Sequence, residues 1–119
     1  MFFFDSFALI EIVKGSKAYK KYTELHPLTT KLNVMEVYYY LLKEKGEEKA
    51  EFYYDYYLPS CISVDDDVVK EAMHFRLKMK EKRLSYIDCI GYILALKLGV
   101  KFLTGDKEFQ NLENVEYVK

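Results

Sequence analysis

The chain has 119 residues, of which 50% are hydrophobic and 31% are charged, and its formal net charge is -1. This length and composition are typical of one globular domain, residues 1–119, and argue against an intrinsically disordered protein. The balance of acidic and basic residues excludes the strong overall positive field of many nucleic-acid-binding proteins, so any nucleic acid would have to contact a local basic patch.

The cysteines and the N-terminal segment exclude further classes of protein. Cys61 and Cys89 are too few for a disulfide framework and show no zinc-ligand spacing with His26 and His74, so we expect reduced core cysteines and assign the histidines no role. Residues 1–13 carry acidic residues and no basic region ahead of the apolar stretch, unlike a signal peptide. No segment approaches the length of an uncharged membrane span, and we expect a cytoplasmic protein without membrane contact.

Apolar segments alternate with helical patterns in the first part of the chain. Residues 1–4, MFFF, predict a buried strand, and residues 7–13 predict a short helix that stops near Gly15. A second helix is expected over residues 16–25. Residues 27–32 predict a second strand, although their apolar content is low.

Two helices rich in tyrosine follow. One is expected from Asn33 to about Gly46, because apolar residues recur there at spacings of three and four. Residues 47–59 predict the other, which ends at Pro59. We expect their tyrosines to pack in the core or against a second subunit, with base stacking as the functional alternative. These tyrosines are Tyr38, Tyr39, Tyr40, Tyr53, Tyr54, Tyr56 and Tyr57.

The last part of the chain repeats the alternation. Residues 61–64 predict a third strand, and the aspartates that follow suit the start of a helix running from residue 65 to about 83. A buried helix is expected between a capping Ser85 and a terminating Gly99, since apolar residues cover nearly its whole circumference. Residues 100–104 predict another strand, and residues 115–118 predict an edge strand.

Short strands that alternate with helices predict a parallel sheet, because parallel neighbours need crossover connections. We therefore expect an α/β fold, a three-layer α/β/α sandwich with a central parallel sheet of four to five strands. In such sheets, ligands bind at the carboxyl ends of the strands.

An aspartate follows two of the expected strands. Asp5 comes directly after MFFF, and Asp106 follows the strand that ends at Thr104 and Gly105. Turn formation alone explains a Gly-Asp pair at a strand end. Two aspartates at the same edge of a parallel sheet nevertheless predict a shared site.

Two more acids lie near expected helix starts. Glu36 stands three residues after Asn33, and Asp88 stands three residues after Ser85. Both spacings match the capping box, in which the acid bonds back to the backbone amide of the cap, and this explanation stays open for each. It is weaker for Asp88, whose apolar neighbours make an ionised carboxylate costly without a partner.

Four acids that converge on one pocket predict a metal site. Neighbouring carboxylates raise one another's pKa unless a cation compensates, and Mg²⁺ and Mn²⁺ prefer oxygen ligands. Such an ion activates water and stabilises the charge of a phosphoryl group during an in-line displacement. The chain offers no Ser-His-Asp set, and neither cysteine has an evident histidine partner.

With these residues in view, the chain resembles the PIN-domain ribonucleases, and among them the single-domain VapC-like toxins. The resemblance spans almost the whole chain and depends on four segments in order: FFFDS, NVMEVYYYL, DCIGYILALKLGV and FLTGDKEF. It implies that four acids bind the metal: Asp5, Glu36, Asp88 and Asp106. Ser6 and Thr104 match small hydroxyl positions beside that site.

The resemblance also implies an activity and partners. It implies Mg²⁺- or Mn²⁺-dependent hydrolysis of RNA, a homodimer, and a small antitoxin whose tail enters the active-site groove. Two positions depart from the family pattern, because Asn33 stands where Ser or Thr is more common and Gly91 where a larger apolar residue is usual. Neither departure removes an acid, so both bear on the shape of the pocket.

A basic segment precedes the helix that carries Asp88. A solvated helix face is the ordinary explanation of such a run. In the functional alternative it offers RNA phosphate contacts at the lip of the acidic pocket. Lys107 is expected to be an exposed turn residue. The residues of the basic segment are Arg76, Lys78, Lys80, Lys82 and Arg83.

Three rival functions can be weighed on the sequence. A receiver-like signalling domain needs adjacent acids after its first strand, whereas Ser6 and Phe7 follow Asp5. A phosphatase with an aspartate nucleophile needs an acid two residues after Asp5, which is also missing. A catalytically silent RNA- or protein-binding module of the same fold stays open, because four carboxylates are necessary for catalysis without being sufficient.

Overall fold

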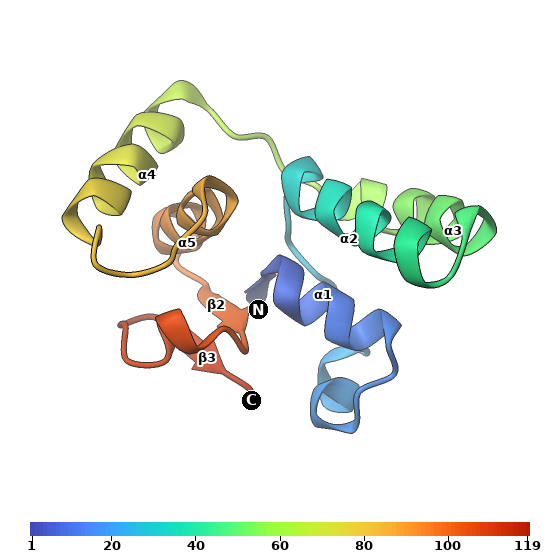
Figure 1. Cartoon of the computed structure of the whole chain (residues 1–119). Helices are drawn as coiled ribbons and strands as arrows, with labels where there is room; N and C mark the ends of the chain where they lie inside the picture. The colour runs from blue at the N-terminus through green and yellow to red at the C-terminus, as the bar shows by residue number, and fades with distance from the viewer.

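The computed structural model describes residues 1–119 and places a parallel three-stranded sheet between two groups of helices (Figure 1). The strands are β1 (Phe2–Phe4), β2 (Lys101–Thr104) and β3 (Val115–Tyr117), in the order β1-β2-β3. Chain segments distant in the sequence thus become neighbours, because β2 lies between the first strand and the last.

The helices divide into two layers. On one side of the sheet lie α1 (Ser6–Val13), α2 (Lys31–Glu44) and α3 (Glu47–Tyr57), and on the other lie α4 (Asp66–Lys78) and α5 (Tyr86–Leu98) (Figure 1). Three short 3₁₀ helices complete the fold: η1 (Lys17–Tyr22), η2 (Leu58–Ser60) and η3 (Lys107–Phe109). The expected α/β/α sandwich is confirmed, and no helix has the length and apolar character needed to cross a bilayer.

Alternation along the two inner strands separates the two cores. Phe3 and Phe102 point into the cluster formed with α4 and α5, while Phe4 and Leu103 point into the cluster formed with α1, α2 and α3. All four side chains are at most 1% exposed. Because residues on both faces of β1 and β2 are buried, both strands are continuous apolar runs in the sequence.

The expected sheet of four to five strands is not reached. Residues 27–32 and 61–64 contribute only isolated bridges, Phe3 with Leu28 and Thr29 with Cys61. These bridges extend the sheet beyond β1 at the expected positions. Pro27 lacks an N–H to donate and Thr30 already serves as a helix cap, which leaves this segment too short for a strand.

Helix ends depart from expectation at three places. Helix α2 begins at Lys31, not at Asn33, and α4 ends at Lys78, so that residues 79–84 form a loop. Residues 17–22 form a 3₁₀ helix instead of an α-helix over residues 16–25. The expected caps of α5 are confirmed: the Ser85 side chain accepts a hydrogen bond at its start, and Gly99 adopts a left-handed conformation at its end.

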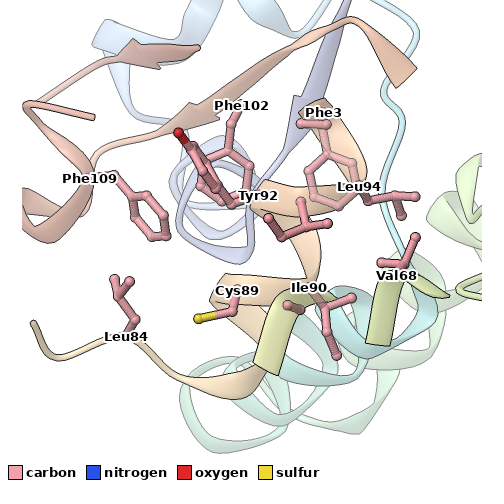
Figure 2. Close-up of a cluster of buried hydrophobic side chains, with 12 residues drawn as sticks. Phe3, Val68, Leu84, Cys89, Ile90, Tyr92, Leu94, Phe102 and Phe109 are labelled. Carbon is pink, nitrogen blue, oxygen red and sulfur yellow. The ribbon is translucent and has the colours of Figure 1, made fainter. Parts of the chain in front are cut away.

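The core beneath α5 explains the small residue at position 91. The rings of Phe3 and Phe102 are stacked with centroids 5.8 Å apart, and Figure 2 shows them beside Tyr92. A Cβ on Gly91 would lie 2.9 Å from Phe3 Cε1 and 3.1 Å from Phe102 Cε1. The two phenylalanines fill the volume that a larger residue would occupy, and Cys89 is buried nearby without a disulfide.

We therefore expect Gly91→Val to destabilise the protein by about 2 kcal/mol, the usual cost of overpacking a filled core. Urea unfolding followed by circular dichroism measures the change. Adding Phe3→Leu makes room for the new side chain, so the double variant should be more stable than the sum of the two single changes. Strictly additive effects would contradict a contact between these positions.

Candidate active site

Asp5 lies at the carboxyl end of β1, where α1 begins. Its backbone N–H donates to the Leu103 carbonyl at 3.0 Å, and Thr104 Oγ1 donates to its Oδ2 at 2.7 Å. The residue is 2% exposed, and its Oδ1 is buried without a hydrogen-bond partner. An unpaired carboxylate oxygen in a protein interior is costly, and such groups occur where a ligand supplies the missing partner.

The electrostatics of Asp5 follow from this placement. Burial raises its pKa to about 8, with a further increase from the negative charge of Asp88 and a smaller one from Glu36. The hydrogen bond from Thr104 opposes these effects because it favours the ionised form. Asp5 therefore lies within electrostatic range of two of the other predicted acids.

Asp106 lies at the end of the adjacent strand, and Thr104 connects it to Asp5. The Asp106 N–H donates to Thr104 Oγ1 at 3.1 Å, while Asp106 Oδ1 accepts the Glu108 N–H at 3.0 Å and begins η3. The turn explanation for this aspartate is therefore correct. It leaves Oδ2 without any hydrogen bond in the structure, so the turn does not use up the carboxylate.

Asp88 forms the complete capping box at the start of α5. Its N–H donates to Ser85 Oγ at 3.0 Å, and its Oδ2 accepts the Ser85 N–H at 2.9 Å. Burial raises the pKa of Asp88, and the charges of Asp106 and Glu36 raise it further, against the effect of the Ser85 hydrogen bonds. Asp88 therefore caps α5 and also belongs to the acidic cluster. On the sequence alone these two roles were alternatives.

Glu36 does not form the capping box that its spacing from Asn33 suggested. The N-cap of α2 is Thr30, whose hydroxyl accepts the Asn33 N–H, and the Glu36 carboxylate instead accepts a hydrogen bond from Ser6. Helix α2 starts two residues earlier than expected, which moves Glu36 beyond its first turn. The acid is thereby free to face the start of α1.

A buried relay of hydrogen bonds holds Glu36. The Thr30 hydroxyl donates to Asn33 Oδ1 at 2.6 Å, Asn33 Nδ2 donates to Ser6 Oγ at 2.8 Å, and Ser6 Oγ donates to Glu36. Each donor in this series fixes the orientation of the next, so the Ser6 proton points at the carboxylate. Asn33 is fully buried, and the sequence did not reveal its part in the site. The i, i+3 spacing of Asn33 and Glu36, which makes the two neighbours on a helix surface, was the available signal.

The four acids lie at one edge of the sheet but do not form a ready ligand set. Asp88 and Glu36 raise the pKa of Asp5, and Asp106 and Glu36 raise the pKa of Asp88, which links the four acids electrostatically. No three acidic, histidine or cysteine side chains lie close enough to hold an ion as they stand. The expected convergence is therefore incomplete. The donor set still fits a hard divalent cation, because it consists of oxygens and includes the unpaired Oδ1 of Asp5.

The basic residues before α5 lie in different environments: Arg76 makes structural contacts, and most of the others are exposed. Arg76 Nε donates to the Leu84 carbonyl at 3.0 Å, and its guanidinium lies over the Tyr86 ring, so Arg76 holds the loop after α4. Lys78 and Lys80 are exposed near the end of that helix, and Lys82 is half-buried. Only Arg83 reaches a groove that Asp106 also lines, together with Lys107.

The tyrosine-rich helices lie on the opposite side of the molecule from α4 and α5 (Figure 1). Tyr57 is buried, Tyr53 and Tyr54 are half-buried, and Tyr56 is 61% exposed. Their rings pack against one another along α3. Core packing is thus confirmed for part of this set, and none of these tyrosines is hydrogen-bonded to the acidic cluster.

Comparisons with known proteins identify relatives of this architecture. The family described as PIN domain matches residues 2–115. A Klebsiella pneumoniae structure described as a toxin-antitoxin complex is 20% identical, with a TM-score of 0.75, covering 98% of this chain and 96% of that one. The Mycobacterium tuberculosis VapC20 structure, described as a sarcin-ricin loop cleaving toxin, is 18% identical, with a TM-score of 0.82 and full coverage of both chains. No curated protein sequence matches.

The raised pKa of Asp5 predicts how stability depends on pH in a chelating buffer. Between pH 4 and 8 the folded state keeps a proton that the unfolded state has lost, so the free energy of unfolding should fall as pH rises, by at most about 1.4 kcal/mol per pH unit. Asp5→Asn removes this proton and should flatten the slope and stabilise the protein at pH 8.

Urea titrations at three pH values test the prediction, with Asp55→Asn on the exposed face of α3 as the matched control. The control should keep the slope of the wild type. Equal slopes for the wild type and Asp5→Asn would show that Asp5 does not carry the buried proton.

Proposed function

The chain belongs to the PIN-domain family, and from this premise we propose that it is a Mg²⁺- or Mn²⁺-dependent endoribonuclease that hydrolyses RNA phosphodiester bonds. One observation carries the proposal: a buried carboxylate with an unpaired oxygen, Asp5, stands within electrostatic range of Asp88 and Glu36. Such a group is destabilising in a protein that binds no cation there, so its presence supports a metal-binding function.

The proposed metal ligands are Asp5, Glu36, Asp88 and Asp106, and three residues hold them in place. Thr104 orients Asp5 and the backbone of Asp106, the Ser85 amide orients Asp88, and Ser6 orients Glu36. A divalent ion bound there supplies an activated water and neutralises charge on the phosphoryl group. The protein contributes a buried and oriented set of oxygens, which limits the rearrangement that binding requires.

A role as a VapC-like toxin is the more specific part of the proposal. It is supported by the match over the full length of two structures described as a toxin-antitoxin complex and a toxin. A cytoplasmic homodimer held inactive by a small antitoxin would follow from that role. The acidic edge of the sheet is the surface that such an antitoxin has to cover, because inhibition requires access of RNA to be blocked.

The rival is a PIN-like module that binds RNA or protein without catalysis. One observation favours it: no three side chains are close enough to hold an ion without movement. Mutual repulsion of the carboxylates accounts for the same observation under the enzymatic proposal, since nothing draws them together without a cation. Measurement of metal-dependent turnover separates the two.

Incubation of the purified protein with end-labelled single-stranded and structured RNAs in Mn²⁺ should give discrete cleavage products on a denaturing gel. Chelator should abolish the products, and Asp5→Asn and Asp88→Asn should each lower the rate by at least about a hundredfold, because each removes a proposed metal ligand. Asp55→Asn, which removes an exposed carboxylate, should cleave like the wild type.

The outcomes separate the alternatives. Intact RNA with the wild type, combined with calorimetric evidence that Mn²⁺ binds and that Asp5→Asn abolishes the binding, would support the silent module. Cleavage that persists in both variants would contradict the assignment of the site.

The relay that ends on Glu36 predicts a role for Asn33 as a positioning residue. Asn33→Ala leaves the Ser6 hydroxyl without its donor and frees it to turn away from Glu36. We expect about tenfold weaker Mn²⁺ binding by calorimetry, which is the usual effect of losing a group that orients a ligand. Stability should fall by about 1–3 kcal/mol, because buried polar groups lose partners.

Ser6→Ala provides the matched test, because it removes the next group of the same relay. If Asn33 acts through Ser6, Mn²⁺ affinity in the double variant should equal that of Ser6→Ala alone. Independent, multiplicative losses would refute the relay.

A further inference from the structure

A groove opens beside Asp106 on the surface formed by α1, η3 and the end of β3. Its volume is about 570 Å³, and its lining includes two aromatic residues, Phe7 and Tyr117, and three basic residues, Arg83, Lys107 and Lys119. Asp106 belongs to both the groove and the acidic cluster, so whatever occupies the groove lies next to the proposed reaction site.

The floor of the groove is fixed by a close backbone approach. A Cβ at Gly105 would lie 2.3 Å from the Val118 carbonyl oxygen and 2.4 Å from Phe7 Cε1. The edge of the Phe7 ring is therefore pressed onto the backbone at Gly105. Tyr19 Oη donates to the Val118 carbonyl at 2.6 Å and holds the chain after β3 in place. The groove is thus built by tertiary contacts.

The cations of the groove are available for a ligand. The two ion pairs of the protein join Lys14 with Glu11 and Lys97 with Glu71, and neither includes a residue of the groove. None of the three basic residues Arg83, Lys107 and Lys119 is engaged in an ion pair.

One acid of the groove is already occupied. Glu108 Oε1 accepts the backbone N–H of Arg83 at 3.0 Å, which anchors the loop after α4 to η3. That contact uses one oxygen of the Glu108 carboxylate and leaves the guanidinium of Arg83 free. Three basic residues against the two acids Asp106 and Glu108 give the groove an excess of positive charge that the net charge of -1 of the whole chain conceals.

Resting on the proposed ribonuclease function, we propose that this groove is a nucleotide subsite that holds one nucleotide of single-stranded RNA next to the scissile phosphate. The base stacks on Phe7 and Tyr117, and the adjoining phosphate contacts Arg83 and Lys107. A paired and stacked base cannot present its face to a protein ring, so the subsite selects unpaired nucleotides.

The chemistry of the lining favours a nucleotide over an acidic peptide. Asp106 and Glu108 would repel a peptide carboxylate and an RNA phosphate alike, but only a base would make use of the two aromatic rings. Phe7 and Tyr117 line the same groove and do not pack on each other; the aromatic neighbour of Phe7 is Tyr19, with ring centroids 6.5 Å apart. Aromatic faces beside free cations match a base joined to a phosphate.

A direct binding experiment uses a single-stranded 2′-O-methyl RNA hexamer with one 2-aminopurine, in chelator, so that no cleavage can occur. Stacking of the 2-aminopurine on a ring quenches its fluorescence, which a change in fold alone does not mimic. The variants are Phe7→Leu, which keeps apolar volume without the ring, and Lys107→Gln. The matched controls are Phe52→Leu on α3 and Lys101→Gln at the opposite end of β2 from Thr104.

Phe7→Leu should weaken binding about tenfold and reduce the quenching, while Phe7→Tyr should restore both, because the ring carries the effect. Lys107→Gln should lower the slope of log affinity against log salt by about 0.7, the value for one phosphate contact to a single strand. Both controls should match the wild type.

Results that overturn the subsite differ from those that overturn the enzyme. Binding without quenching, equal loss in variants and controls, no binding by the wild type, or competition by an acidic peptide but not by RNA would each refute the subsite. Quenching that depends on Phe7, together with no metal-dependent cleavage of unmodified RNA, would keep the subsite and refute the ribonuclease. Cleavage by the wild type with no change in KM in Phe7→Leu would do the reverse.

Discussion

The site depends on one hydroxyl group, that of Thr104. It donates to Asp5 and accepts the backbone N–H of Asp106, and so joins the ends of two adjacent parallel strands. Parallel pairing of β1 with β2 places Phe4 beside Leu103, so the residues that follow each strand emerge side by side. Once this pairing forms, Asp5 is buried and Asp106 turns outward. The burial that raises the pKa of Asp5 and the position of Asp106 beside the groove both follow from that placement.

Burial of Asp5 lowers the stability of the fold and supplies the proposed site with an unpaired oxygen. Its Oδ1 lacks a partner, and its pKa lies near 8 because burial and the charge of Asp88 disfavour ionisation. The surrounding structure tolerates this cost because two well-packed cores flank the sheet. Strain that packing elsewhere has to offset is typical of a site that awaits a ligand. The same reasoning explains why a cation or a proton should stabilise the protein.

Both departures from the family pattern prove to have local compensations. At Gly91 the stacked rings of Phe3 and Phe102 occupy the missing volume. At Asn33 the longer amide side chain spans from the Thr30 hydroxyl to Ser6, and supplies both the acceptor and the donor that the relay needs. At both positions the neighbouring side chains fit the residue that is present, so the local packing and hydrogen bonds are complete.

The sequence by itself determined the alternation of strands and helices, the acids at strand ends, and the caps of α5, because these depend on patterns within a few residues of each other. It misplaced the start of α2 and the end of α4, and it overestimated the strands near Leu28 and Cys61. Only the tertiary structure decided that Ser6 holds Glu36 and that Phe7 faces a groove shared with Asp106. Those contacts join residues 30 and about 100 positions apart, and no local periodicity records which distant side chains a packed sheet brings together.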